Sequence, residues 1–152
     1  MDNQRILTDE VEPTIRAQLK REFGVDFTPQ ALPLRSGGKF NFDAVSSDLK
    51  VVASIKSSRG TTRGGKLPSG AVKAAITDLY YLSLVDAPCR FLVVTDQGFY
   101  DRLAHELVRK KRVAPGLEIK HVSLPENLAK RVQAVLDRAS AKQRSRVDKP
   151  GP

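Results

Sequence analysis

The sequence predicts an α/β fold in which a mixed central sheet lies between helices. Segments with apolar residues at every third or fourth position alternate with short runs rich in β-branched and aromatic residues. The run 90–95 contains a continuous apolar stretch, which is typical of a strand buried on both faces. With 152 residues, the chain has room for one domain with a sizeable core. We therefore predict a single domain over 1–140, followed by a basic, disordered tail over 141–152.

The first predicted element is a helix over 8–23, where apolar residues recur every four positions. Thr8 and Glu12 are alternative first residues, since Pro13 fits best in a first turn, and Gly24 suits the end of the helix. The next segment, 25–38, contains two prolines and two glycines. We expect it to be mostly loop, with a short extended piece.

A β-hairpin follows, because two alternating runs, 39–45 and 49–56, flank a polar Ser-Ser-Asp turn. Side chains alternate between the two faces of a strand with period two. The first run is therefore expected to place Phe40, Phe42 and Ala44 on one face.

The same alternation places Asn41 and Asp43 on the opposite face of the first strand. On the second strand, Val52, Ser54 and Lys56 are expected to share one face. Asp43 and Lys56 can therefore lie on the same side of neighbouring strands.

Beyond the hairpin, the apolar periodicity predicts three more helices and two more strands. They are a helix over 70–85, a strand over 90–95, a helix over 98–112, a strand over 117–123 and a helix over 125–141. The order helix, hairpin, helix, strand, helix, strand, helix packs naturally as a mixed sheet between helices.

The pair of Asp43 and Lys56 has the chemistry that metal-assisted phosphodiester cleavage needs. A carboxylate holds a divalent cation, and a lysine positions water and offsets charge on the phosphate. The simpler alternatives are an aspartate that hydrogen-bonds within the hairpin and a lysine that protects a sheet edge. The apolar residues before Lys56 indicate an internal strand, which favours the functional interpretation.

These residues resemble the core of the PD-(D/E)xK nucleases, the restriction-endonuclease-like superfamily, in which an Asp on one strand precedes (Asp/Glu)-x-Lys on the next. Asp43 matches the first position, Lys56 matches the last, and Ser54 stands where the second acid is expected. The order of elements over 8–138 also resembles the common core of the superfamily. The resemblance implies a restriction-endonuclease-like mixed sheet flanked by helices, and a catalytic set of Asp43, Ser54 and Lys56 that acts with Mg²⁺, or Mn²⁺ in its place.

Because Ser54 carries no charge, a further acid beside Asp43 has to complete the metal site. Glu12, with Glu10 beside it, lies at the start of the first helix, where members of the superfamily often present a glutamate. The alternative is a favourable charge at a helix N-terminus. Asp78 lies in the next helix, which supplies the migrated acid in some Ser-x-Lys restriction enzymes. The alternative interpretation of Asp78 is an acid on the surface of the helix.

The charge predicts a polyanionic partner, because 26 Lys and Arg residues against 17 Asp and Glu residues give a formal net charge of +9. We expect this partner to be DNA, with RNA left open. The loop 58–70 has four glycines, no acid and three cations, Arg59, Arg63 and Lys66, which suit a nucleic-acid backbone. A solvated loop is the alternative. A homodimer is a plausible assembly, since cutting both strands commonly takes two sites.

Other site classes and compartments fit the sequence poorly. One cysteine excludes an intrachain disulfide, and with two histidines it leaves few ligands for zinc. The apolar stretches are too short to span a bilayer, and the N-terminus does not resemble a secretory signal. We therefore expect a cytoplasmic protein without a membrane partner.

The sequence leads to three functional hypotheses. The first is a metal-dependent endonuclease that hydrolyses DNA phosphodiester bonds, of the restriction or DNA-processing type. The second is a catalytically inactive nucleic-acid-binding module or subunit that kept the fold and lost the acid. The third is a structural or interaction protein whose charge binds RNA or an acidic partner. Ser54 distinguishes the first two, and the glycine-arginine loop distinguishes both from the third.

Overall fold

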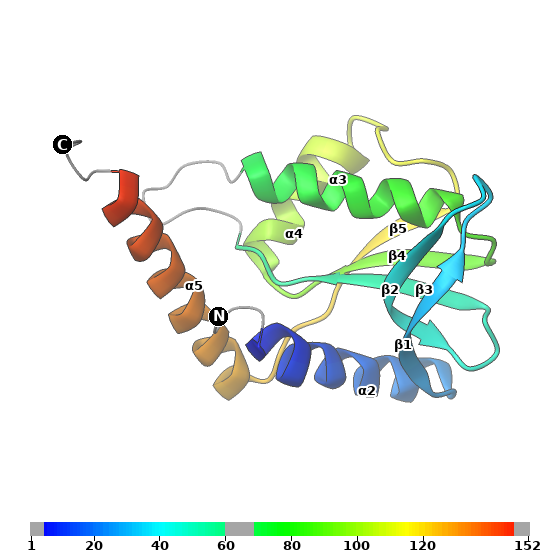
Figure 1. Cartoon of the computed structure of the whole chain (residues 1–152), viewed down its shortest axis with the longest axis horizontal. Coiled ribbons are helices and arrows are strands. Elements are labelled where there is room, and N and C mark those ends of the chain that lie inside the picture. The colour runs from blue at the N-terminus through cyan, green and yellow to red at the C-terminus, as the bar shows by residue number, and fades with distance from the viewer. Residues whose placement is uncertain (1–4, 60–68, 148–152) are drawn as a thin grey trace.

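The structure is a computed structural model that describes residues 5–59 and 69–147, with side chains up to Ala139. Its described part contains one five-stranded sheet in the order β1-β2-β3-β4-β5. The first three strands are antiparallel neighbours, and β3, β4 and β5 are parallel. Helices cover both faces of this sheet, as the positions of α2 and α3 in Figure 1 show. The predicted α/β architecture with a mixed sheet is confirmed.

The elements follow one another in an order close to the predicted one. They are η1 (Leu7–Val11), α2 (Glu12–Phe23), β1 (Phe27–Pro33), β2 (Lys39–Ser46), β3 (Val51–Lys56), α3 (Ser69–Leu84), β4 (Cys89–Val94), α4 (Gln97–Leu103), η2 (Ala104–Val108), β5 (Leu117–His121) and α5 (Glu126–Val147). The helix predicted over 98–112 thus corresponds to α4 and η2, which end at Val108.

The sheet separates two hydrophobic cores. One core joins η1, α2 and α5 to one face of the sheet, and the other joins α3, α4 and η2 to the opposite face. Strand β4 contributes to both, because Phe91 and Val93 belong to the first core and Leu92 and Val94 to the second. The prediction of a strand buried on both faces is confirmed.

The N-terminal helix forms as its sequence predicts. The π-helical turn η1 runs directly into α2, so Pro13, the second residue of α2, lies inside a continuous helical segment and has no N–H to donate there. Gly24 ends the helix in a left-handed conformation with φ 77°, and its N–H donates to the carbonyl of Lys20 at 2.8 Å. Glycine adopts this conformation without the steric cost that other residues pay.

The segment 27–33 is a regular strand, longer than the short extended piece predicted within a loop over 25–38. It forms β1, which pairs with β2 at the edge of the sheet. An edge strand accommodates proline, because one side of it needs no ladder hydrogen bonds. Pro29 and Pro33 are therefore compatible with a strand, although in the sequence they indicate a loop.

A β-bulge lies in β2 beside this edge. Thr28 is opposite Val45, whereas Gln30 is opposite Phe42, so the two residues Asp43 and Ala44 face the single residue between Thr28 and Gln30. A bulge of this kind shifts the alternation of side chains along its strand.

The bulge explains why the expected face of Ala44 is wrong. Phe42 belongs to the core beneath α3, and Phe40 packs against the same core. Ala44 instead belongs to the core beneath α2 and α5. On β3, where no bulge is recorded, Val51, Ala53 and Ile55 share the α2 side as the alternation predicts.

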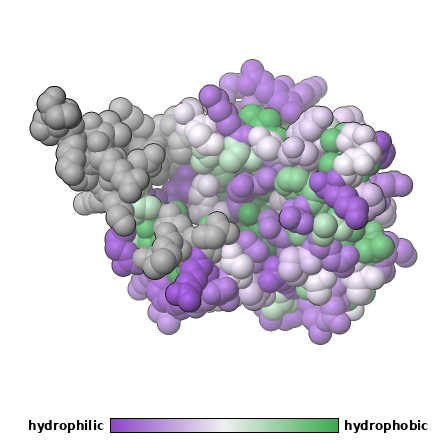
Figure 2. All heavy atoms as spheres, viewed as in Figure 1, coloured by the Kyte–Doolittle hydropathy of each residue, from purple (hydrophilic) through white to green (hydrophobic). Residues whose placement is uncertain are grey.

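The chain end also differs from the expectation. Helix α5 continues to Val147 and so includes part of the segment for which we expected disorder. Residues 148–152 lie outside the described part. Figure 2 shows that one face of the molecule carries mostly hydrophilic residues with small hydrophobic groups between them. Among the described helices, none is long and apolar enough to cross a membrane.

Candidate active site

A cavity of about 300 Å³ lies where β2 and β3 stop pairing. The registered pairs between these strands are Ala44 with Ala53 and Val45 with Val52. Beyond them, the start of β2 and the end of β3 line the cavity together. Residues from η1, α2, α3 and α5 complete its wall, so the cavity connects elements from both faces of the sheet.

This cavity brings together all the residues that the sequence predicts for catalysis and metal binding. They are Glu12, Asp43, Ser54, Lys56 and Asp78. Asp43 and Lys56 therefore converge on one site, as the alternation within the hairpin predicts.

Asp43 holds the two strands together at the edge of the cavity. Its carboxylate oxygen Oδ2 accepts a hydrogen bond from the backbone N–H of Ile55 at 2.8 Å. Burial raises the pKa of Asp43, the N–H of Ile55 opposes this shift, and the nearby charge of Asp78 adds to it. The hydrogen bond that we considered as a structural alternative is thus real, and it fixes the carboxylate within the cavity.

Lys56 lies at the end of an internal strand, since β3 is between β2 and β4. Its Nζ is 2.9 Å from Oδ2 of Asp78, and the two side chains are 27% and 15% exposed. Asp78 is therefore directed from α3 towards the sheet, and its interpretation as a surface acid is wrong. The ion pair places a second carboxylate beside the lysine.

Glu12 provides a third carboxylate in the cavity wall. Burial raises its pKa, and so does the charge of Asp43, while the guanidinium of Arg16 opposes the shift. Glu12 Oε1 lies 3.6 Å from Arg16 Nη1, one helical turn further along the chain. Its charge thus acts within the cavity as well as at the start of α2.

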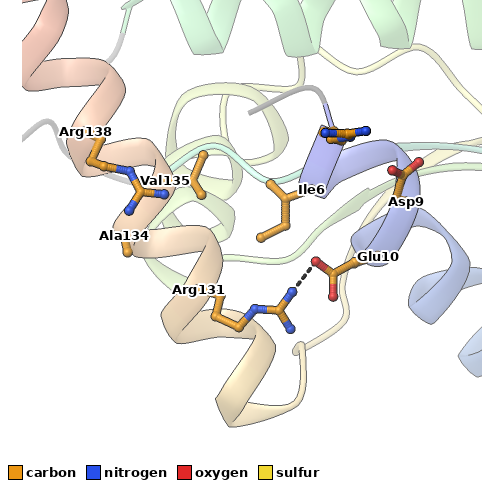
Figure 3. Close-up of a pocket in the computed structure, with 8 residues that line it drawn as sticks. Ile6, Asp9, Glu10, Arg131, Ala134, Val135 and Arg138 are labelled. Atoms are coloured by element: carbon orange, nitrogen blue, oxygen red, sulfur yellow. Dashed lines mark hydrogen bonds and ion pairs between the residues drawn. The ribbon is translucent and has the colours of Figure 1, made fainter. Parts of the chain in front are cut away.

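Glu10, the neighbouring acid, takes no part in this cavity. Its carboxylate pairs with Arg131 of α5 in a separate hollow between η1 and that helix, as Figure 3 shows. The position of Glu10 on the helix turns it away from Asp43, whereas Glu12 is directed towards it.

Arg16 is a residue of the site that sequence reasoning missed. Its Nη1 donates a hydrogen bond to the backbone carbonyl of Asp43 at 2.9 Å. The spacing of four residues from Glu12 indicates an ion pair on one helix. The carbonyl of Asp43 is a tertiary partner, and no local pattern reveals it.

Ser54 is 2% exposed and lines the cavity between Asp43 and Lys56. Counting back from the pair of Ala44 and Ala53 places Asp43 opposite Ser54. A hydroxyl at this position can bond a water or a phosphate oxygen, but it supplies no negative charge.

The predicted nucleic-acid contacts are only partly described. Arg59 Nη1 lies 2.5 Å from Oδ1 of Asp137 on α5, and the arginine side chain is 17% exposed. Arg59 is therefore held by α5 in this structure. Arg63 and Lys66 lie outside the described residues.

The cavity suits a hard divalent cation in the kind of donor it offers. Glu12, Asp43 and Asp78 are carboxylates, the ligands that Mg²⁺ and Mn²⁺ prefer. In the part of the chain that the structure describes, however, no three His, Cys, Asp or Glu side chains are grouped closely enough to hold a metal ion. Glu12 pairs with Arg16, and Asp78 pairs with Lys56. The three carboxylates are therefore the right kind of ligand for such a cation, but they are not grouped around one point.

No protein family, curated protein or solved structure matches this chain. The resemblance to the PD-(D/E)xK nucleases therefore depends on the residues of the hairpin and on the order of the elements.

Proposed function

We propose that this protein is a metal-dependent endonuclease of the PD-(D/E)xK type that hydrolyses DNA phosphodiester bonds. One observation carries the proposal, namely the convergence of Asp43, Lys56 and two further carboxylates on a single cavity. Carboxylates with raised pKa values beside a lysine in a cavity are typical of a functional site.

Each residue has a role that follows from its position. Asp43, fixed by the N–H of Ile55, would hold Mg²⁺ or Mn²⁺ together with Glu12 or Asp78. When bound, the cation supplies charge stabilisation for the phosphate and lowers the pKa of a water. Lys56 orients the attacking water and offsets the charge that builds on the phosphate oxygens.

Asp78 supports the proposal that an acid has migrated from the position of Ser54. It extends from the helix that follows the lysine, and its carboxylate reaches the cavity. The raised pKa of Asp43 includes a contribution from the charge of Asp78, so the two carboxylates repel each other. A divalent cation held by both carboxylates would relieve this repulsion.

The net charge of +9 supports DNA as the substrate, because phosphate neutralisation supplies most of the affinity of such proteins. A homodimer is part of the same proposal, since two sites cut the two strands of a duplex. A cytoplasmic setting belongs to it as well, and is supported by the single cysteine.

A second candidate function is a catalytically inactive nucleic-acid-binding subunit. Two observations favour it: Ser54 stands in place of an acid, and the described residues contain no assembled group of three metal ligands. The nuclease and the inactive subunit share the fold and the charge, so only catalysis distinguishes them.

Cleavage of a supercoiled plasmid with Mg²⁺, with Mn²⁺ or with a chelator tests the proposal. We expect nicking or linearisation only with a metal, and a loss of at least about 100-fold for Asp43→Ala and for Lys56→Ala, which remove charge from the reacting centre. Lys50→Ala, which removes an exposed lysine from the turn of the same hairpin, is the matched control and should cleave like the parent.

The outcomes separate the candidates. Metal-dependent cleavage that survives Asp43→Ala would place the active site elsewhere and refute the proposal. DNA binding without cleavage by the parent would establish the inactive subunit instead.

A further inference from the structure

The bulge in β2 lies opposite a residue of β1 that has no backbone donor. Asp43 and Ala44 bulge opposite Pro29, the residue between Thr28 and Gln30. Proline has no N–H, so β1 offers no backbone donor at this point of the ladder. A backbone carbonyl that is left without a partner when partly buried costs free energy.

Arg16 supplies the donor from α2. Its Nη1 donates to the carbonyl of Asp43 at 2.9 Å, and its side chain is 16% exposed. A hydrogen bond from a charged donor is stronger than one between neutral groups. The contact joins a helix to the one residue of the hairpin whose carboxylate lines the cavity.

The same guanidinium also contacts Glu12, at 3.6 Å. Glu12 and Asp43 carry like charges that act on each other across the cavity wall. A cation that touches both residues reduces this repulsion and keeps the two carboxylates on one site. Arg16 thus contacts two residues that line the cavity, through the backbone carbonyl of Asp43 and through the carboxylate of Glu12.

We propose that Arg16 is a positioning residue, which fixes the bulge at Asp43 and thereby orients the Asp43 and Glu12 carboxylates towards the cavity. It acts through these residues and does not itself contact a substrate. The claim that Arg16 holds Asp43 in place follows from the described contacts alone. The claim that Arg16 matters for metal binding rests on the proposed function. These two consequences are therefore measured separately.

The first measurement is hydrogen exchange of the Ile55 amide, which donates to the Asp43 carboxylate at 2.8 Å. In Arg16→Ala we expect this amide to exchange roughly tenfold faster relative to the amide of buried Leu82, because the charged hydrogen bond that fixes Asp43 is lost. A purely global loss of stability would accelerate both amides equally. Arg16→Lys, which keeps a cationic donor, should restore part of the protection.

The second measurement is calorimetric titration with Mn²⁺ in the absence of DNA. We expect Arg16→Ala to bind Mn²⁺ about tenfold more weakly than the parent, because its ligands are no longer held in place. Arg21→Ala, which removes an exposed arginine from the same helix, should match the parent in both measurements.

Each outcome decides one of the two claims. Unchanged exchange of Ile55 in Arg16→Ala, or an equal change at Leu82, would overturn the positioning role whatever the metal does. A parent that binds no Mn²⁺ would refute the proposed function, while the exchange data would still decide the role of Arg16.

Discussion

Asp43 serves the fold and the candidate chemistry at the same time. Its carboxylate accepts the N–H of Ile55, its carbonyl accepts Arg16, and its side chain lines the cavity. Burial raises the pKa of this carboxyl, because the charged form loses hydration, and the charge of Asp78 adds to the shift. The charged form is therefore costly in the free protein, and a bound cation would remove that cost.

The raised pKa of Asp43 makes the stability of the fold depend on pH. A raised pKa means that the folded state binds the Asp43 proton more tightly than the unfolded state does, so stability falls as the pH rises through the raised pKa. Asp43→Asn keeps an oxygen acceptor for Ile55 and removes the charge. Near neutral pH we expect the variant to melt at a higher temperature than the parent, with the difference vanishing below the ordinary aspartate range.

Thermal melts across this pH range, without metal, measure the effect. Asp86→Asn, which removes an exposed carboxylate, serves as the control and should leave the melting temperature unchanged. A lower melting temperature for Asp43→Asn near neutral pH would show that the Asp43 charge stabilises the fold, contrary to the account.

The residues of the site differ in how far the sequence predicts them. The alternation within the hairpin predicts that Asp43 and Lys56 converge, because the alternation of each strand and the short turn between the strands are local features of the sequence. The choice between Glu12 and Glu10 depends on how α2 packs against the sheet. The contact of Arg16 depends on the bulge, which no local pattern shows.

At the scale of elements, α5 reaches both the cavity and the predicted nucleic-acid loop. Leu136 lines the cavity, and the next residue, Asp137, pairs with Arg59 at 2.5 Å. An acid that holds one of the predicted DNA-binding cations competes with phosphate for it. Helix α5 is therefore expected to weaken DNA binding through this one ion pair.

We predict that Asp137→Asn binds duplex DNA about two- to fivefold more tightly than the parent, the range expected for release of a partly exposed ion pair. Fluorescence anisotropy at several salt concentrations measures it. Glu126→Gln, which removes an exposed acid from the same helix, is the matched control.

The role of Arg59 is tested by the double variant Arg59→Ala with Asp137→Asn. It should lose the gained affinity, because the released cation is absent. If the double variant binds as tightly as Asp137→Asn alone, Arg59 is not a DNA contact.

The helices and strands differ in how well the sequence predicts them. Long periodic segments, such as η1 together with α2, and helix α3, form within a residue or two of their predicted bounds, because their apolar stripes pack against a core. For 25–38 the sequence predicts a loop with only a short extended piece, because prolines indicate a loop. The place of β1 at the sheet edge makes its prolines compatible with a strand of seven residues. Without β1 the bulge in β2 has no partner strand and cannot be predicted.

At the scale of the whole molecule, the cavity lies where the two cores approach each other. Leu7 and Val11 reach it from the core of α2 and α5, and Phe40 and Asp78 reach it from the side of α3. The gap opens because β2 and β3 separate beyond their registered pairs. Ligands from both layers can therefore meet at one point.

The most direct test of the central claim is the position of Mn²⁺ in crystals grown with the ion, located by its anomalous scattering. We expect a peak in the cavity beside Asp43, with Glu12 or Asp78 among the ligands of the ion. A metal bound only at a site that excludes Asp43, or an empty cavity at a Mn²⁺ concentration that supports DNA cleavage, would contradict it.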